Sequence, residues 1–351
     1  MALAVVSLLW LSGELYTTKG GLEHQLRTGG VYGRTIFADD HHYKVLLYGR
    51  RRPLVLALGS SRTMQFRETY LDPSQRFMTA GGAMHTLEEG DRFVTETFPT
   101  WRPQVVILGV DYWWFQPAAA TAETTADDAR YDSYSYVLAA GASALPRLVP
   151  HLLARVDVAA PFSGIGAVGS RGRTFGDGFR TDGSHAAAGF YSHGVGDPGV
   201  LDVDYQYTLG RIRNETHPFE GGGHVSAEAT AVFRRLLARL ASQGTKVALF
   251  LPPFSPPVYQ ALAGSPRYAI LGEVRRLVAA TAVEQGMKFG DYSSMPFPDR
   301  SCYTDGFHGS EQLYALIARE LIDPARTDRS RMDVVLPHPG SPCSLLENLS
   351  K

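Results

Sequence analysis

Short apolar runs alternate with helical patterns along much of this chain of 351 residues, and the alternation limits its possible folds more than any other feature. The runs that we interpret as buried strands are, in chain order, residues 53–58, 76–80, 103–110, 246–251 and 287–291. They are rich in Val, Leu and Ile on both faces, which is typical of a parallel sheet covered by helices.

Apolar residues at helical spacing lie between these runs. The helices that we expect are residues 83–98, 226–242, 268–285 and 312–322. Gly244 and Gly286 end the second and third helices, and Ser310 is the expected N-cap of the fourth. Strands and helices in this order predict a doubly wound α/β layer.

One long segment, residues 112–224, breaks the alternation between the third and fourth strands. It contains a helical stretch at 134–156 and a Gly-rich stretch at 162–199. Because a stretch of this length inside a compact domain is usually functional, we expect an insertion that covers the carboxyl edge of the sheet, not a separate domain. The predicted α/β domain is then 45–323, and residues 324–351 form a poorly ordered tail.

The chain begins with an apolar run, Met1–Gly13, and carries no charge before Glu14. The run is shorter than the roughly 20 residues of a membrane-spanning helix, and it resembles the apolar part of a signal peptide or anchor. We interpret residues 1–20 as a signal or membrane-anchor segment. The protein is then exported or membrane-anchored and lies in the periplasm or at the cell surface. The alternative is a cytoplasmic protein with a buried N-terminal helix.

Composition argues against several classes of protein. The chain has 34 Lys and Arg against 35 Asp and Glu, whereas a nucleic-acid-binding protein normally has a basic surplus. Two cysteines, Cys302 and Cys343, are too few for a disulfide scaffold, but one bridge is open to them in an oxidising compartment. The histidines lack metal-ligand spacing, and no phosphate-binding glycine motif occurs in a strand–turn–helix context, so we expect no metal and no cofactor.

Four segments at the expected strand ends carry residues suited to catalysis. The first strand ends in Gly-Ser-Ser-Arg at 59–62, where a serine can point its hydroxyl into the crevice at the carboxyl edge of the sheet. Two glycines follow the second strand at 81–82, and Asp111 follows the third. Asp305 and His308 precede the last helix, at a spacing that lets the carboxylate orient the imidazole. Each segment by itself is also consistent with a structural turn or a cap.

Taken together, the Gly-Ser-Ser, Gly, Gly-x-Asp and Asp-x-x-His segments resemble the SGNH/GDSL hydrolase superfamily over residues 53–111 and 246–322. The resemblance implies a three-layer α/β/α fold with a flavodoxin-like parallel sheet. It also implies a catalytic triad in which Ser61 is the nucleophile, His308 the general base and Asp305 the acid that orients it.

The same resemblance implies an oxyanion hole, built in the family from the nucleophile's N–H, a glycine and an asparagine. Here the matching positions are Gly82 (or Gly81) and Asp111. Two residues depart from the family: Ser60 replaces an aspartate, and Asp111 replaces the asparagine. An ionised aspartate cannot donate a hydrogen bond to an oxyanion, so Asp111 is protonated or turned away, or the hole uses backbone donors only. Arg62 either binds an anionic substrate group or pairs with a carboxylate.

The Gly-Ser-Ser variant is similar to exported, membrane-anchored members of the superfamily, including the D-alanine-transfer protein of teichoic acid modification and proteins paired with membrane O-acyltransferases. This implies a serine esterase or acyltransferase that acts on acyl groups, acetyl being expected, of a cell-surface glycan or small acyl ester. A membrane O-acyltransferase is the implied partner. The alternative is a catalytically degenerate glycan-binding or scaffolding protein.

Two further segments are candidates for acceptor binding. Gly178–Ser184 is rich in hydrogen-bonding groups, and Tyr112–Phe115 places four aromatic side chains just after the third strand. The aromatic side chains either stack on a sugar or pack in the core.

Overall fold

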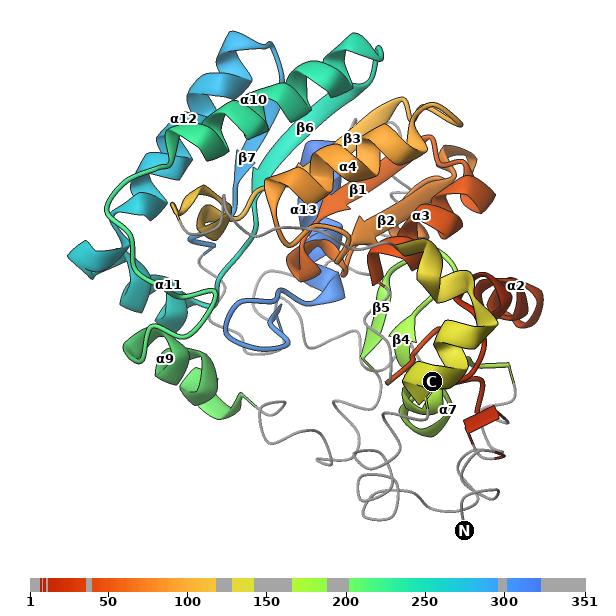
Figure 1. The fold of residues 1–351 in the computed structure, drawn as a ribbon. Helices are drawn as coiled ribbons and strands as arrows, with labels where there is room; N and C mark the ends of the chain where they lie inside the picture. Colours follow the sequence, from red (N-terminus) through yellow and green to blue (C-terminus); the bar gives the residue numbers. More distant parts are fainter. Residues whose placement is uncertain are drawn as a thin grey trace. The chain divides into compact units, whose positions relative to one another are not determined.

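The computed structural model describes residues 7, 9–10, 12–35, 40–117, 128–141, 166–187, 202–295 and 302–322. The chain divides into two compact units. The first unit consists of residues 1–50 and 125–201, and the second of residues 51–124 and 202–351. Figure 1 shows the helices and strands of both, coloured along the chain.

A five-stranded parallel sheet forms the centre of the second unit, in the order β2-β1-β3-β6-β7. Its strands are β1 (Val55–Gly59), β2 (Phe77–Gly81), β3 (Val105–Gly109), β6 (Lys246–Leu251) and β7 (Lys288–Asp291). This is the flavodoxin-like order of a doubly wound sheet, in which all carboxyl ends meet at one edge. The predicted three-layer α/β/α fold is confirmed, and all five strands lie within two residues of their predicted bounds.

Helices flank this sheet on both faces, which is why β1 and β2 are buried at every position. The helices of the second unit are α4 (Leu87–Thr97), α9 (Gln206–Arg213), α10 (Ala227–Ser242), α11 (Pro256–Ala263), α12 (Ile270–Glu284) and α13 (Glu311–Leu321). In Figure 1, α4 and α10 pack side by side over the sheet, and α13 lies behind it.

The ends of these helices follow the capping residues seen in the sequence. The hydroxyl of Ser226 accepts a hydrogen bond from the N–H of Ala229 at the start of α10, and Ser310 does the same for Leu313 in α13. Gly244 follows α10 with a φ of 75°, a left-handed conformation that glycine adopts without strain.

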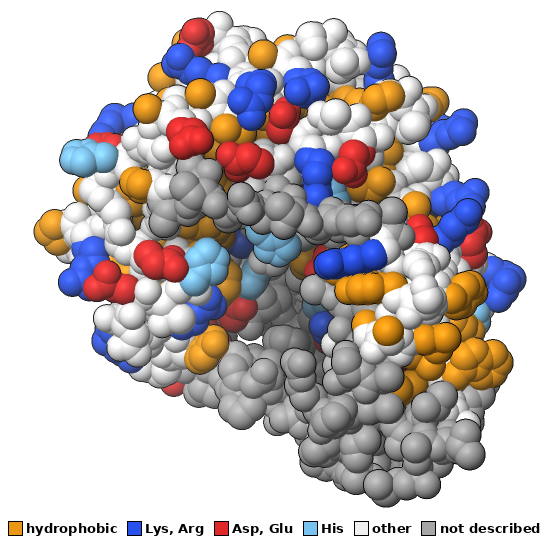
Figure 2. All heavy atoms as spheres, in the orientation of Figure 1, with side chains coloured by type: hydrophobic (Ala, Val, Ile, Leu, Met, Phe, Trp, Pro, Cys, Tyr) orange, Lys and Arg blue, Asp and Glu red, His pale blue; other side chains and the backbone are white. Residues whose placement is uncertain are grey.

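The outer surface of α4 and α10 carries charges of both signs. Asp91 on α4 pairs with Arg235 and Arg239 on α10. Figure 2 shows acidic and basic side chains interspersed over this part of the surface. Such mixed charge solvates the two helices without creating a strong field of one sign.

The first unit is built on a small hairpin and short helices. Its elements are α2 (Thr18–Thr28), α3 (Asp40–Arg51), α7 (Ser170–Phe175), β4 (Asp177–Phe179) and the antiparallel β5 (His185–Ala187). The backbone of Tyr32 bridges to both Val168 and Phe179. The Tyr43 ring stacks between those of Tyr32 and Phe179, at centroid distances of 4.3 Å and 5.2 Å. These aromatic contacts form the centre of the unit.

The division into units differs from the single insertion predicted at residues 112–224. Residues 125–201 belong with the first 50 residues, and residues 202–224 belong with the sheet. The reason is the long-range pairing of Tyr32 with β4, which no local sequence pattern indicates. The second unit also begins at residue 51 rather than at the predicted 45.

Several predictions about the ends of the chain concern residues outside the described ranges. Residues 134–141 are helical, as expected, but the rest of the helix predicted at 134–156 is not described. The predicted tail at 324–351 and most of the apolar run at 1–13 also lie outside. Among the residues that are described, no helix is long and apolar enough to cross a membrane.

Gly81, the last residue of β2, lies against the turn that follows β1. A Cβ at this position would be 2.5 Å from the backbone nitrogen of Met64 and 2.6 Å from the carbonyl carbon of Thr63. Because those atoms are backbone, they cannot move aside as a flexible side chain would.

The substitution Gly81→Ala should therefore lower the free energy of unfolding, by about 1–3 kcal/mol. Urea denaturation of the two proteins measures the difference. Gly210→Ala is the matched control, because Gly210 lies inside α9 with its nearest contact at 3.7 Å, and alanine there should stabilise by up to about 1 kcal/mol. Equal stability of wild type and Gly81→Ala would contradict this account of the turn.

Candidate active site

The side chains of Ser61, His308 and Asp305 form one hydrogen-bonded chain in the second unit. Ser61 Oγ lies 2.8 Å from His308 Nε2, and His308 Nδ1 lies 2.7 Å from Asp305 Oδ2. In such a chain the imidazole can take the hydroxyl proton while the carboxylate fixes its tautomer and orientation. The fold thus joins the three residues that the sequence indicated, although Ser61 and His308 are 247 positions apart.

A short 3-10 turn over Ser61–Thr63 presents the serine directly after β1. The Ser60 hydroxyl caps this turn by accepting a hydrogen bond from the N–H of Arg62 at 3.1 Å. The Thr63 hydroxyl donates to the carbonyl of Ser60 at 2.7 Å, and the Tyr314 hydroxyl donates to that of Arg62. Ser60 therefore stabilises the conformation of the turn. At this position the SGNH/GDSL superfamily, which the sequence resembles, has an aspartate.

Asp305 organises the loop that carries the imidazole. Its Oδ1 accepts hydrogen bonds from the N–H groups of Phe307 and His308 at 2.8 Å and 2.9 Å, which leaves Oδ2 for the ring. Burial works to raise the pKa of Asp305, but the His308 charge and hydrogen bond and the two backbone N–H groups outweigh it, so the pKa lies below its usual value. The carboxylate is therefore ionised at neutral pH and can stabilise a charged imidazole.

Asp202 anchors the same loop, and sequence reasoning missed it. Its Oδ2 accepts hydrogen bonds from the N–H of Gly306 at 3.0 Å and from the Thr208 hydroxyl. Its Oδ1 accepts from the N–H groups of Tyr207 and Thr208 at the start of α9. An aspartate a few residues before a helix is a capping signal, but nothing local indicates its second bond, to Gly306.

Arg62 and Asp111 form a buried ion pair beside the triad. Arg62 Nη1 lies 2.8 Å from Asp111 Oδ1, and both side chains are 1% exposed. Nε of Arg62 donates to the carbonyl of Phe307 at 2.9 Å, and Nη2 donates to the carbonyls of Pro252 and Pro253 at 2.8 Å and 2.7 Å. Of the two expectations for Arg62, pairing with a carboxylate is the one observed. One guanidinium thus joins the ends of β1, β3 and β6 to the loop of His308.

Asp111 is an acceptor in this arrangement. Burial raises the pKa of its carboxyl group, while the charge and hydrogen bond of Arg62 and a hydrogen bond from the Ser60 hydroxyl work against that rise. Oδ1 is engaged by Arg62, and Oδ2 is buried without a hydrogen-bond partner among the described residues. An ionised carboxylate only accepts hydrogen bonds, so it does not replace the donor that the SGNH/GDSL superfamily has in its asparagine.

The two predicted glycine donors are also engaged. The N–H of Gly81 donates to the Thr79 hydroxyl at 3.0 Å, and that of Gly82 donates to the carbonyl of Gly59 at 3.0 Å. The expectation that Gly81 or Gly82 serves an oxyanion therefore does not agree with the hydrogen bonds observed. Within the part of the chain that the structure describes, the N–H of Ser61 makes no hydrogen bond and is a backbone donor available beside the nucleophile.

The four aromatic residues Tyr112–Phe115 are all buried, which favours core packing over sugar stacking. In the first unit, polar groups of the segment Gly178–Ser184 bond mainly to one another. Asp182 accepts from both the N–H and the hydroxyl of Ser184, and Arg180 donates to that hydroxyl at 3.1 Å. Lys44, whose pKa burial lowers to about 7, donates to the carbonyl of Gly183. A role of this segment in acceptor binding stays a prediction.

The substitution Asp111→Asn would restore the residue of the resembling family, yet it should lower the free energy of unfolding by about 3–5 kcal/mol, because it leaves the buried guanidinium of Arg62 without a counter-charge. Urea denaturation gives the difference. Asp91→Asn is the matched control, since Asp91 pairs with more exposed arginines and should cost less than about 1 kcal/mol. If both variants lost less than about 1 kcal/mol of the free energy of unfolding, the site would not depend on the Arg62–Asp111 pair.

The described residues contain no group of three or more His, Cys, Asp or Glu side chains that could hold a metal ion. No protein-family model fits this chain, and no curated protein is similar to it in sequence.

Proposed function

We propose that this protein is an exported serine esterase or acyltransferase that forms an acyl-enzyme at Ser61. The observation that carries the proposal is the hydrogen-bonded chain Ser61–His308–Asp305, with heavy-atom distances of 2.8 Å and 2.7 Å. The ionised state of Asp305 adds to it, because an anion beside the imidazole favours proton transfer from the serine hydroxyl.

In the proposed reaction, Ser61 Oγ attacks the acyl carbonyl and His308 Nε2 takes the hydroxyl proton. The imidazole then protonates the leaving alkoxide, and the acyl group stays on Ser61 as an ester. Water in an esterase, or a sugar hydroxyl in a transferase, loses its proton to His308 and attacks this ester. Ser61 recovers its proton from His308 at the end of the cycle.

We further propose that the acyl ester belongs to a cell-surface glycan or a small molecule, and that a membrane O-acyltransferase is the partner. These proposals rest on the resemblance of the Gly-Ser-Ser variant and on the apolar run at residues 1–13. Cys302 supports the extracytoplasmic location, because it is buried and disulfide-bonded, and disulfides persist mainly in oxidising compartments. Cys343, the other cysteine, lies outside the described residues.

A second candidate function is non-catalytic glycan binding or scaffolding. The observation that favours it is the engagement of the expected oxyanion donors: the N–H groups of Gly81 and Gly82 bond within their own turn, and Asp111 bonds to Arg62. Removing one such donor from an oxyanion hole typically costs about 10²–10³ in rate, so a site without these expected donors is a slow enzyme or none.

The substitutions Ser61→Ala and His308→Ala should each abolish hydrolysis of p-nitrophenyl acetate and p-nitrophenyl butyrate by the full-length protein, because one removes the nucleophile and the other its base. Initial rates of release of p-nitrophenolate provide the measurement. Ser74→Ala, at an exposed serine of the second unit, is the control that retains the wild-type rate.

Labelling by a fluorophosphonate distinguishes a catalytic from a degenerate site when the rates are low. The reagent needs an activated serine but no natural donor or acceptor. Labelling of wild type that is lost in both variants supports the triad. Wild-type protein that neither hydrolyses esters nor reacts with the reagent would refute the enzyme and leave the binding protein.

The substitution Asp305→Asn should lower kcat by about 10⁴, the loss typical when the orienting carboxylate of a triad becomes an amide. It should also remove a pH-dependent part of the stability. Since the folded-state pKa of Asp305 is lowered, its contribution is fully present above the unfolded-state value, about 3.9, and is lost as the pH falls through the folded-state pKa. Urea denaturation at a series of pH values should show wild type and variant converging below pH of about 4. A constant difference across that series would contradict the assignment.

A further inference from the structure

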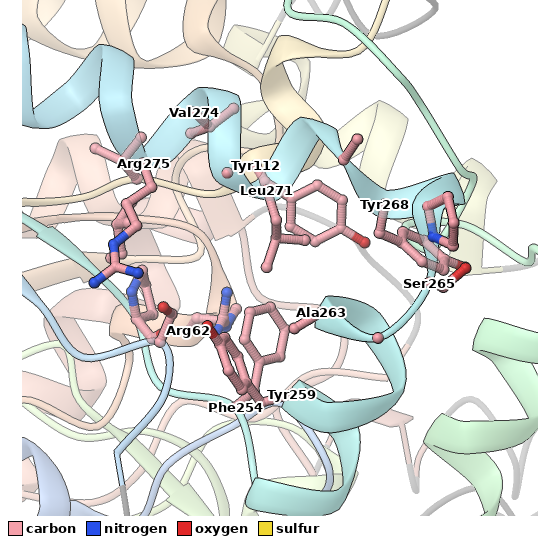
Figure 3. A pocket seen from close by; sticks show the side chains of 18 residues that line it. Arg62, Tyr112, Phe254, Tyr259, Ala263, Ser265, Tyr268, Leu271, Val274 and Arg275 are labelled. Carbon is pink, nitrogen blue, oxygen red and sulfur yellow. Dashed lines mark hydrogen bonds between the residues drawn. The ribbon is translucent and has the colours of Figure 1, made fainter.

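A cavity of about 440 Å³ opens in the second unit beside the carboxyl ends of β3 and β6, between α11 and α12. Figure 3 shows side chains from these elements pointing toward one another around it. Apolar residues form much of its wall: Val110, Leu251, Phe254, Leu271 and Val274. The volume falls in the range of small-molecule sites, about 300–1,000 Å³.

Three polar residues of this wall, Tyr268, Arg62 and Arg275, are already engaged, while Tyr259 and Ser265 add two hydroxyls to it. The Tyr268 hydroxyl donates to the carbonyls of Ile212 and Phe219. Nε, Nη1 and Nη2 of Arg62 all donate to protein oxygens, and its guanidinium stacks on the Phe254 ring at 3.9 Å. Arg275 is paired with Asp291. The cavity therefore presents mainly hydrocarbon and ring faces to an occupant, which suits an apolar chain better than a sugar.

The cavity adjoins the residues around the proposed nucleophile. Arg62, which follows Ser61 directly, lines it. So do Val110 and Tyr112, on either side of Asp111. Strand β1 pairs with β3, and β3 pairs with β6. The ends of β1 and β6 are therefore two strand spacings, about 10 Å, apart. The cavity is lined by residues that follow β1, β3 and β6.

We infer that this cavity holds the hydrocarbon chain of the acyl group carried on Ser61, and that the substrate is a medium-chain acyl ester rather than an acetyl ester. The inference rests on the proposed function. An acetyl group ends one carbon beyond its carbonyl and reaches little of this wall, whereas an octanoyl chain carries six further carbons that can lie along it. The ester bond to the donor alcohol breaks as the bond to Ser61 Oγ forms, and the hydroxyl proton passes through His308 to the leaving oxygen.

Chain-length dependence in the full-length protein tests the inference. Burial of one methylene is worth about 0.8 kcal/mol, or about fourfold in kcat/KM. The ratio of kcat/KM for p-nitrophenyl octanoate to that for p-nitrophenyl acetate should then exceed about 100. Ala263→Trp places an indole where the exposed end of α11 lines the cavity, and should reduce the ratio at least tenfold. Val283→Trp, on the exposed face of α12, should keep the wild-type ratio.

A wild-type ratio near one, or an unchanged ratio in Ala263→Trp, would overturn the assignment of the cavity while leaving the triad standing. If wild type hydrolyses neither ester, the fluorophosphonate decides whether the enzyme stands, and calorimetric binding of sodium octanoate to Ser61→Ala tests the cavity alone. Binding weakened at least tenfold by adding Ala263→Trp supports a chain-binding cavity, and absence of binding refutes it.

Discussion

The buried ion pair between Arg62 and Asp111 is the interaction on which the geometry of this site depends. A guanidinium that is 1% exposed is tolerated only if its charge is balanced and its N–H groups are bonded. Asp111 supplies the charge, and the carbonyls of Phe307, Pro252 and Pro253 accept the remaining hydrogen bonds. Those partners lie at the ends of separate strands and in the loop of His308. The positions of Ser61 and His308 relative to each other therefore depend on the counter-charge and the hydrogen bonds of the Arg62 guanidinium.

The departures from the resembling family are consistent with one coupled set around that cation. With Arg62 buried, an asparagine at position 111 would leave a positive charge without a counterpart. With Asp111 in place, an aspartate at position 60 would set a second carboxylate close to the first, because the Ser60 hydroxyl is near enough to act on the pKa of Asp111. Serine at 60 avoids that repulsion and still caps the turn of Ser61. Each substitution by itself weakens the resemblance, but together they balance the buried charge of Arg62 and keep the turn of Ser61 capped.

Local signals in the sequence predicted the sheet, whereas the grouping of the three hydrogen-bonded residues came from the resemblance to the SGNH/GDSL superfamily. Continuous apolar runs define β1, β3 and β6, and doubly wound connectivity brings the residues after them to one edge. The long-range pairings have no such local signal in the sequence. The pairing of Tyr32 with Phe179, which separates the first unit, joins segments whose own sequences do not indicate each other. The same holds for the bond from Asp202 to Gly306, and for the engagement of the Gly82 N–H by Gly59.

The hydrogen bonds around Ser61 also bear on how an acyl transfer could proceed here. With the N–H groups of Gly81 and Gly82 used inside their turn, the developing oxyanion meets fewer donors than in a complete hole, and each missing donor costs about 3–4 kcal/mol of transition-state stabilisation. Binding energy from a part of the substrate remote from the reacting carbonyl can offset such a loss if it is realised in the transition state. The apolar cavity that Arg62 and Val110 line is a feature of the second unit that can provide this energy. A short ester would gain none of this binding energy. We therefore expect the site of Ser61 to discriminate between substrates by the length of the acyl chain more than by the type of ester bond that it breaks.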